Sequence, residues 1–232
     1  MLKRVNQNYY FGLDFLRGIA IVLMLITHGF RLFVKSTPNY QAGTDLAERL
    51  LNLFAIIEPY TSALFLFLAG IGITISFSQK KDSANNWLKR QSVKAGQLYL
   101  IGMGLFFIEK GIQSPDFWIS PSILSTIAIS MITVASSLLI PWGTVLGLIL
   151  TAGITYYFEG TGTSGINAGP GGVFPLITFA LWGSLIWQIF KQKKYYALGL
   201  IGLLSLGSYF NDAPWVQHYN STYHQWTSGS TG

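Results

Sequence analysis

The stretch that decides the fold is LDFLRGIAIVLMLITHGFRLF, residues 13–33. About 20 residues at a rise of about 1.5 Å each span the roughly 30 Å of hydrocarbon in a bilayer, so this run predicts a membrane-crossing α-helix. The same run carries Asp14, Arg17, His28 and Arg31. A charge near the bilayer centre costs about 2.5–3.5 kcal/mol and usually faces a protein interior or a wet cavity. A functional site is therefore the first interpretation of this helix.

The four polar side chains of this helix fall on one face. Because an α-helix turns about 100° per residue, Asp14 and Arg17, at i and i+3, can pair. His28 follows Arg17 by eleven residues and returns to within about 20° of the same direction, and Arg31 lies about one turn further on. The alternative is that the charged residues only anchor the helix ends by snorkelling, with His28 as a packing residue. The shared face favours function, because anchoring requires no common direction.

Composition places the chain among polytopic membrane proteins. Of its 232 residues, 50% are hydrophobic and 10% are charged, whereas soluble domains carry about 25% charged residues. The mean hydropathy is +0.42. The absence of cysteine excludes disulfides, thiolate metal sites and cysteine nucleophiles. We read the charged N-terminal run as an uncleaved first span, because the apolar stretch is too long for a signal peptide and lacks a cleavage site.

Six further apolar runs predict an all-α transmembrane bundle of about seven spans. These runs cover approximately residues 60–77, 93–108, 123–140, 144–158, 173–190 and 195–210. A short amphipathic surface helix, capped by Thr44, is expected to end at Glu58 and Pro59 before the second span. Residues 1–210 form the predicted transmembrane domain, and residues 211–232 form an extracytoplasmic polar tail or the start of a missing segment. Because no closing helix follows, we expect the chain to be C-terminally truncated.

The positive charges predict the orientation. With a cytoplasmic N-terminus, ten of the basic residues lie inside and four outside. The inner set is Lys3, Arg4, Lys80, Lys81, Lys89, Arg90, Lys94, Lys191, Lys193 and Lys194, and the outer set is Arg31, Lys35, Arg49 and Lys110. The basic residues that give the net charge of +6 are therefore concentrated on one side of the membrane. This distribution indicates a membrane protein rather than a nucleic-acid-binding protein. Trp87 is expected at the membrane interface.

Several residues are candidates for catalysis or for binding a phosphate. A neutral imidazole with a pKa of about 6.5 can take a proton from an attacking hydroxyl or amine, which makes His28 a candidate general base. Arg17 could meet a phosphate or a carbonyl oxygen. The basic loop with Lys89, Arg90 and Lys94 is a second phosphate-facing candidate, although the positive-inside rule explains it more simply. Glu58 either balances the charge of His28 or is an interfacial acid at a helix start.

Glycines and the remaining histidines give weaker signals. Gly70 and Gly72 allow a neighbouring backbone or a ligand to come close to the second span. The G-x-G-x-x-G pattern that begins at Gly160 opens a glycine-rich loop rather than a helix, so it is no dinucleotide site. His218 and His224 have no carboxylate or cysteine cluster beside them, and no metal site is expected.

Residues 13–20, LDFLRGIA, followed by His28, resemble the first helix of the transmembrane acyltransferases. Residues 64–71, LFLFLAGI, resemble the second helix of the same superfamily, and Phe174-Pro175-Leu176 through Trp182-Gly183 is a weaker match. The residues of the first two stretches are more similar to the heparan-α-glucosaminide N-acetyltransferase-like family than to the acyltransferase-3 family. The similarity covers about the first 80 residues well and the rest loosely.

The resemblance implies transfer of an acyl group, usually acetyl, from cytosolic acyl-CoA to an extracytoplasmic sugar or glycan hydroxyl or amine. The expected partners are the lipid bilayer, acyl-CoA as donor substrate and a carbohydrate acceptor, with no permanently bound cofactor and no nucleic acid. The expected location is the cytoplasmic membrane. The candidate catalytic residues are His28, Arg17, Asp14 and Glu58; the candidate donor-binding residues are Arg17, Lys89, Arg90, Lys94 and Gly70; and Arg31 is the candidate substrate-binding residue.

One departure from the family pattern concerns histidine. The resemblance to the heparan-type enzymes implies a catalytic histidine in the loop after the first helix. Residues 35–58 of this chain contain no histidine. Either His28 carries this role or the chain is an inactive, truncated relative. A further alternative is a transporter or an assembly subunit. A proton-coupled transporter is expected to carry acids in several spans, and the middles of the second to seventh predicted spans carry none.

Overall fold

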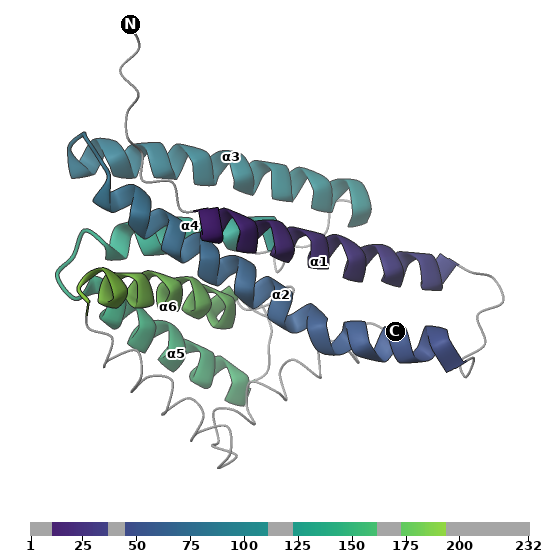
Figure 1. Ribbon diagram of the computed structural model, residues 1–232. Helices are drawn as coiled ribbons and strands as arrows, with labels where there is room; N and C mark the ends of the chain where they lie inside the picture. Colours follow the sequence, from purple (N-terminus) through teal and green to yellow (C-terminus); the bar gives the residue numbers. More distant parts are fainter. Residues whose placement is uncertain (1–10, 37–44, 111–122, 162–172, 194–232) are drawn as a thin grey trace, which may run out of the picture.

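The computed structural model describes residues 11–36, 45–110, 123–161 and 173–193, and within these ranges the chain is helical with short turns (Figure 1). The helices are α1 (Phe11–Ser36), α2 (Asp45–Ser78), α3 (Ala84–Lys110), α4 (Ile123–Ser137), α5 (Gly143–Thr161) and α6 (Val173–Lys191). Only the course of the backbone is described for residues 27–28 and 30–36 of α1, 45–60 of α2, 106 and 109–110 of α3, 155–161 of α5 and 175 of α6. The predicted seventh span and the polar tail lie outside the described residues.

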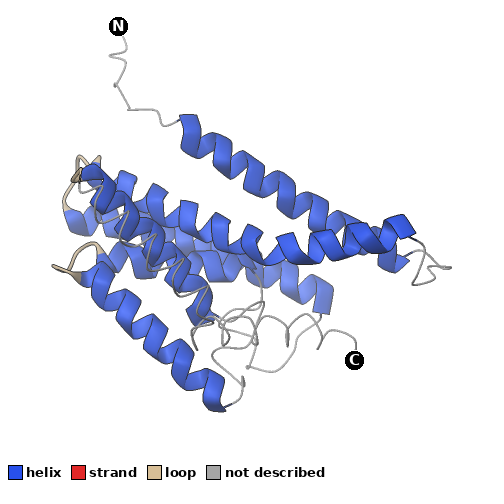
Figure 2. Ribbon diagram, turned by 60° about the horizontal axis from the view of Figure 1, so that its bottom comes forward, coloured by secondary structure: helices blue, strands red, loops and turns tan. Residues whose placement is uncertain are grey.

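Helix α2 is the centre of the bundle. It packs against α1, α4 and α6, while α3 packs on α4 and α5 packs on α6 (Figures 1 and 2). The prediction of two helices separated at Glu58 and Pro59 is wrong, because α2 is one helix from Asp45 to Ser78. Proline lacks the N–H for a single i→i−4 hydrogen bond, and a long helix with packed neighbours tolerates that loss.

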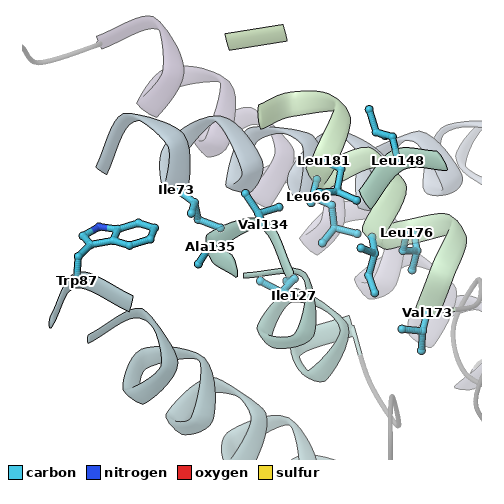
Figure 3. Packing of buried hydrophobic residues seen from close by; sticks show 12 residues of the cluster. Leu66, Ile73, Trp87, Ile127, Val134, Ala135, Leu148, Val173, Leu176 and Leu181 are labelled. Carbon is cyan, nitrogen blue, oxygen red and sulfur yellow. The ribbon is translucent and has the colours of Figure 1, made fainter. Parts of the chain in front are cut away.

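Residues of α2, α3, α4, α5 and α6 form the core (Figure 3). Leu66 and Leu181 are fully buried there, and the Trp87 side chain is 1% exposed. The Trp87 indole Nε1 donates a hydrogen bond to Ser76 Oγ at 3.1 Å, and its ring meets the Phe77 ring edge-on at 4.9 Å between centroids. Trp87 is therefore buried inside the bundle, because α2 supplies both an apolar ring and a polar partner for the indole; its expected depth at the membrane interface stays a prediction.

Helices α2 and α6 approach each other so closely that their backbones touch. A Cβ atom built on Gly70 would lie 2.7 Å from the Ala180 carbonyl carbon, and one built on Gly183 would lie 2.8 Å from the Phe67 carbonyl carbon. Close approach through small residues is the usual way in which helices associate in lipid. Thr74 Oγ1 adds a hydrogen bond to Ser184 Oγ across this contact at 2.7 Å.

A chain of uncharged polar side chains continues from that contact. The Gln188 side-chain amide donates to Ser184 Oγ at 3.2 Å and to Thr144 Oγ1 of α5 at 3.1 Å. Buried polar groups need such partners, because an unsatisfied one costs about 1–3 kcal/mol. Among the described residues, the buried polar side chains are hydroxyls and an amide, with no carboxylate or ammonium among them. These hydrogen bonds therefore join α2, α5 and α6 in this part of the interior.

The outward faces of the helices are apolar. Large exposed side chains include Ile19, Val22 and Leu25 on α1 and Leu100 and Leu105 on α3. Exposed apolar faces of this extent indicate contact with a membrane or with partners. Within the described part of the chain, the segment Thr61–Ser78 is long and apolar enough to cross a membrane, while the apolar stretches of α4, α5 and α6 are shorter. The number of spans stays a prediction.

Candidate functional site

The site is built on the first two turns of α1. Arg17 Nη1 donates a hydrogen bond to Asp14 Oδ1 at 2.8 Å, which confirms the pairing that the i, i+3 spacing predicts. The side chains of Arg17 and Asp14 are 38% and 45% exposed. The pair is therefore fixed within the protein and is still open to a ligand.

The guanidinium of Arg17 lies against Gly72 of α2. A Cβ atom built on Gly72 would overlap Arg17 Nη2 and would lie 3.3 Å from Arg17 Cζ. Real Cβ atoms do not make contacts that close, so the lack of a side chain at Gly72 creates the space in which the guanidinium sits. Arg17 is thus held by a carboxylate on its own helix and by a glycine on the neighbouring helix.

Gly70 and Gly72 serve different neighbours. Two residues along a helix correspond to about 200°, so the two glycines lie on nearly opposite faces of α2. Gly70 faces the α6 backbone at Ala180, whereas Gly72 faces Arg17 of α1. The sequence allowed either a neighbouring backbone or a ligand to approach Gly70. The structure places the Ala180 backbone there, so Gly70 is a packing residue in this contact and not a candidate for donor binding.

The remaining candidates on α1 and α2 lie toward the other end of these two helices, which run in opposite directions (Figure 1). Arg31 follows Arg17 by fourteen residues, and Glu58 precedes Gly72 by fourteen residues. Counted from the contact of Arg17 with Gly72, the backbone positions of Arg31 and Glu58 therefore lie at a similar level, with His28 about one turn away. The side chains of His28, Arg31 and Glu58 lie outside what the structure describes, so their roles stay predictions.

The cationic residues of the predicted basic loop lie partly on a helix. Lys89, Arg90 and Lys94 all belong to α3, which begins at Ala84 rather than near residue 93 as predicted. The Ser83 hydroxyl accepts a hydrogen bond from the Asn86 N–H at 3.3 Å, and such a cap starts the helix ahead of the basic residues.

The cations at this end of the bundle differ in what they contact. Arg90 forms an ion pair with Asp82, and Lys80 Nζ lies over the Phe77 ring at 3.5 Å from its centroid. Lys89 and Lys94 are exposed, and no ion pair is recorded for either within the described part of the chain. Both side chains are therefore available to an anionic ligand. Where side chains are described, no group of three His, Asp or Glu residues suitable for a metal ion occurs.

The sequence predicted the pairing of Asp14 with Arg17 but did not place Gly72 beside the guanidinium. The sequence feature that could have indicated this contact is the second glycine of the A-G-I-G run at residues 69–72. Spacing alone places Gly72 on a face of α2 without saying which helix lies there. A half-exposed guanidinium with one carboxylate partner keeps further N–H donors for phosphate or carbonyl oxygens.

Comparison with known protein families gives a match over most of the chain. Residues 10–219 match the family described as heparan-alpha-glucosaminide N-acetyltransferase, catalytic. The comparisons with curated proteins and with solved structures gave no match. The matched range includes Asp14, Arg17 and Gly72.

Proposed function

Because the chain belongs to the heparan-alpha-glucosaminide N-acetyltransferase catalytic family, we propose that it is a membrane-embedded acyltransferase. It moves an acyl group, acetyl in the first instance, from cytosolic acyl-CoA to a hydroxyl or amine of a sugar or glycan on the other side of the membrane. The observation that carries the proposal is the Asp14–Arg17 pair seated on Gly72, because a fixed and accessible guanidinium is suited to a phosphorylated donor.

The donor is bound at the basic end of the bundle. Arg17 donates hydrogen bonds to a phosphate or another polar group of CoA, and Asp14 keeps the guanidinium oriented. Lys89 and Lys94 supply exposed positive charge on α3, and Arg90 supplies a third cation beside Asp82. The acyl-bearing arm of the donor then extends along α1 toward His28, which lies roughly 16 Å from Arg17 at the helical rise.

The transfer step takes place near His28. The acceptor oxygen or nitrogen attacks the thioester carbonyl carbon, and His28 removes the acceptor proton as that bond forms. The carbon–sulfur bond then breaks, and CoA leaves as a thiolate that takes up a proton. Arg31, at the same level of the α1–α2 pair, binds the acceptor, and Glu58 balances the charge of His28.

The test measures thiol release from acetyl-CoA by the full chain in liposomes or detergent, with glucosamine as the acceptor probe. The chain contains no cysteine, so every free thiol in the assay comes from CoA. We expect the wild type to release thiol and to form acetylated glucosamine. We expect His28→Ala to lose at least about 100-fold in kcat, the usual contribution of a general base, while keeping its yield in the membrane.

The matched control is His224→Ala, which removes a histidine outside the matched range. It should behave as the wild type does. Full activity of His28→Ala would overturn the assignment of the base. A wild type that neither binds CoA nor releases thiol would overturn the acyltransferase assignment and would favour a transporter or an assembly subunit.

A further inference from the structure

We propose that Gly72 is a positioning residue for the donor: its missing side chain sets where the Arg17 guanidinium lies. The inference rests on the proposed function, because it assigns a purpose to the position of Arg17. It concerns a residue that touches neither the acceptor nor the acyl group and acts only through Arg17.

The geometry separates Gly72 from the packing glycines. At Gly70 and Gly183 the atoms that a Cβ would meet belong to the backbone of a neighbouring helix, at 2.7 Å and 2.8 Å for the nearest carbonyl carbons. At Gly72 the atoms that a Cβ would meet, Nη2 and Cζ, belong to the far end of the Arg17 side chain. A backbone cannot yield without separating the helices, whereas an arginine tip can rotate away.

A methyl group at position 72 therefore changes the site and leaves the fold intact. It drives the guanidinium out of its seat, so that Arg17 loses its alignment both with Asp14 and with a bound donor. Charge and hydrogen-bonding capacity are unchanged; only the position differs. Bidentate recognition of phosphate depends on the placement of the planar fork, so this shift weakens donor binding.

The first experiment compares Gly72→Ala with the wild type in the thiol-release assay. We expect KM for acetyl-CoA to rise about tenfold, as befits one lost charge-assisted contact, with kcat within about twofold. The melting temperature should stay close to that of the wild type. The control is Gly18→Ala, on α1 beside Arg17, where a Cβ meets no atom within 4 Å, and it should leave KM unchanged.

The second experiment tests whether Gly72 acts through Arg17. Lysine has a compact ammonium on a flexible stem and no planar fork, so in an Arg17→Lys background Gly72→Ala should change KM by less than about twofold. An equal rise of KM in both backgrounds would mean that Gly72 acts by packing, and would overturn the inference.

A folding defect is also informative. If Gly72→Ala lowers the yield, the double variant Arg17→Ala/Gly72→Ala removes the clashing tip and should restore it. Failure to restore it would overturn the inference. Absence of donor turnover by the wild type would overturn the proposed function instead. An active wild type together with an unchanged KM in Gly72→Ala would overturn only the role of Gly72.

Discussion

At the scale of single residues, Arg17 depends on its two supports, and Asp14 can be removed without disturbing the helix. An exposed ion pair contributes about 0.2–1 kcal/mol to stability, so Asp14→Asn should leave the melting temperature nearly unchanged. The loss of the carboxylate frees the guanidinium to adopt other rotamers. We expect KM for acetyl-CoA to rise about three- to tenfold, equivalent to about 0.7–1.4 kcal/mol, as measured by thiol release.

The control for Asp14→Asn is Glu109→Gln, which neutralises a carboxylate at the far end of α3. An unchanged KM in both variants would show that Asp14 does not orient Arg17 for the donor. A large loss of stability in Asp14→Asn alone would instead indicate a structural pair.

Only part of the arrangement around Arg17 could be predicted from the sequence. The Asp14–Arg17 pair follows from the three-residue spacing, because both residues belong to one helix whose geometry is known in advance. The seat at Gly72 could not be predicted, because it depends on which helix packs on which face of α2. The contacts of Trp87 could not be predicted for a related reason, because only the three-dimensional arrangement brings Ser76 and Phe77 to its indole.

At the scale of helices, the contact of α2 with α6 depends on glycine at two positions. Gly183→Ala places a methyl group against the Phe67 backbone, and overpacking of this kind costs about 1–3 kcal/mol or more. We expect a melting temperature lower by more than about 4 °C, or loss of the monodisperse peak in size-exclusion chromatography. Gly70→Ala should behave in the same way.

The matched control is Gly96→Ala on the exposed side of α3, where a Cβ meets nothing within 4 Å. Alanine is favoured over glycine in a helix by about 0.8–1.0 kcal/mol, so this variant should be as stable as the wild type or more stable. Equal stability of Gly183→Ala and Gly96→Ala would contradict the close backbone contact.

Helix positions were predictable where apolar runs end at turn residues. The predicted spans at 144–158 and 173–190 match α5 (Gly143–Thr161) and α6 (Val173–Lys191) to within a few residues. The errors lie where polar residues continue a helix. Glu58 and Pro59 sit within α2, and Lys89 and Arg90 belong to α3, because hydropathy marks the apolar part of a helix and not its hydrogen-bonded ends.

At the scale of the whole molecule, the exposed lysines whose side chains the structure describes gather toward one end of the bundle. The end of α2, the start of α3 and the end of α6 lie at this end (Figure 1), and the exposed side chains include Lys81, Lys89 and Lys191. From the positive-inside rule we predict that this end faces the cytoplasm. This orientation would place Arg17 on the side where acyl-CoA is available, as the proposed function requires.

This orientation can be measured directly, because a chain without cysteine accepts single cysteines as reporters. Lys81→Cys lies in the exposed turn between α2 and α3, and Ser164→Cys lies between α5 and α6. In intact cells that produce the protein, a membrane-impermeant maleimide should label Ser164→Cys at once and Lys81→Cys only after permeabilisation. The reverse pattern would place Arg17 on the outer side, away from cytosolic acyl-CoA, and the proposed direction of transfer would be wrong even if the purified protein were active.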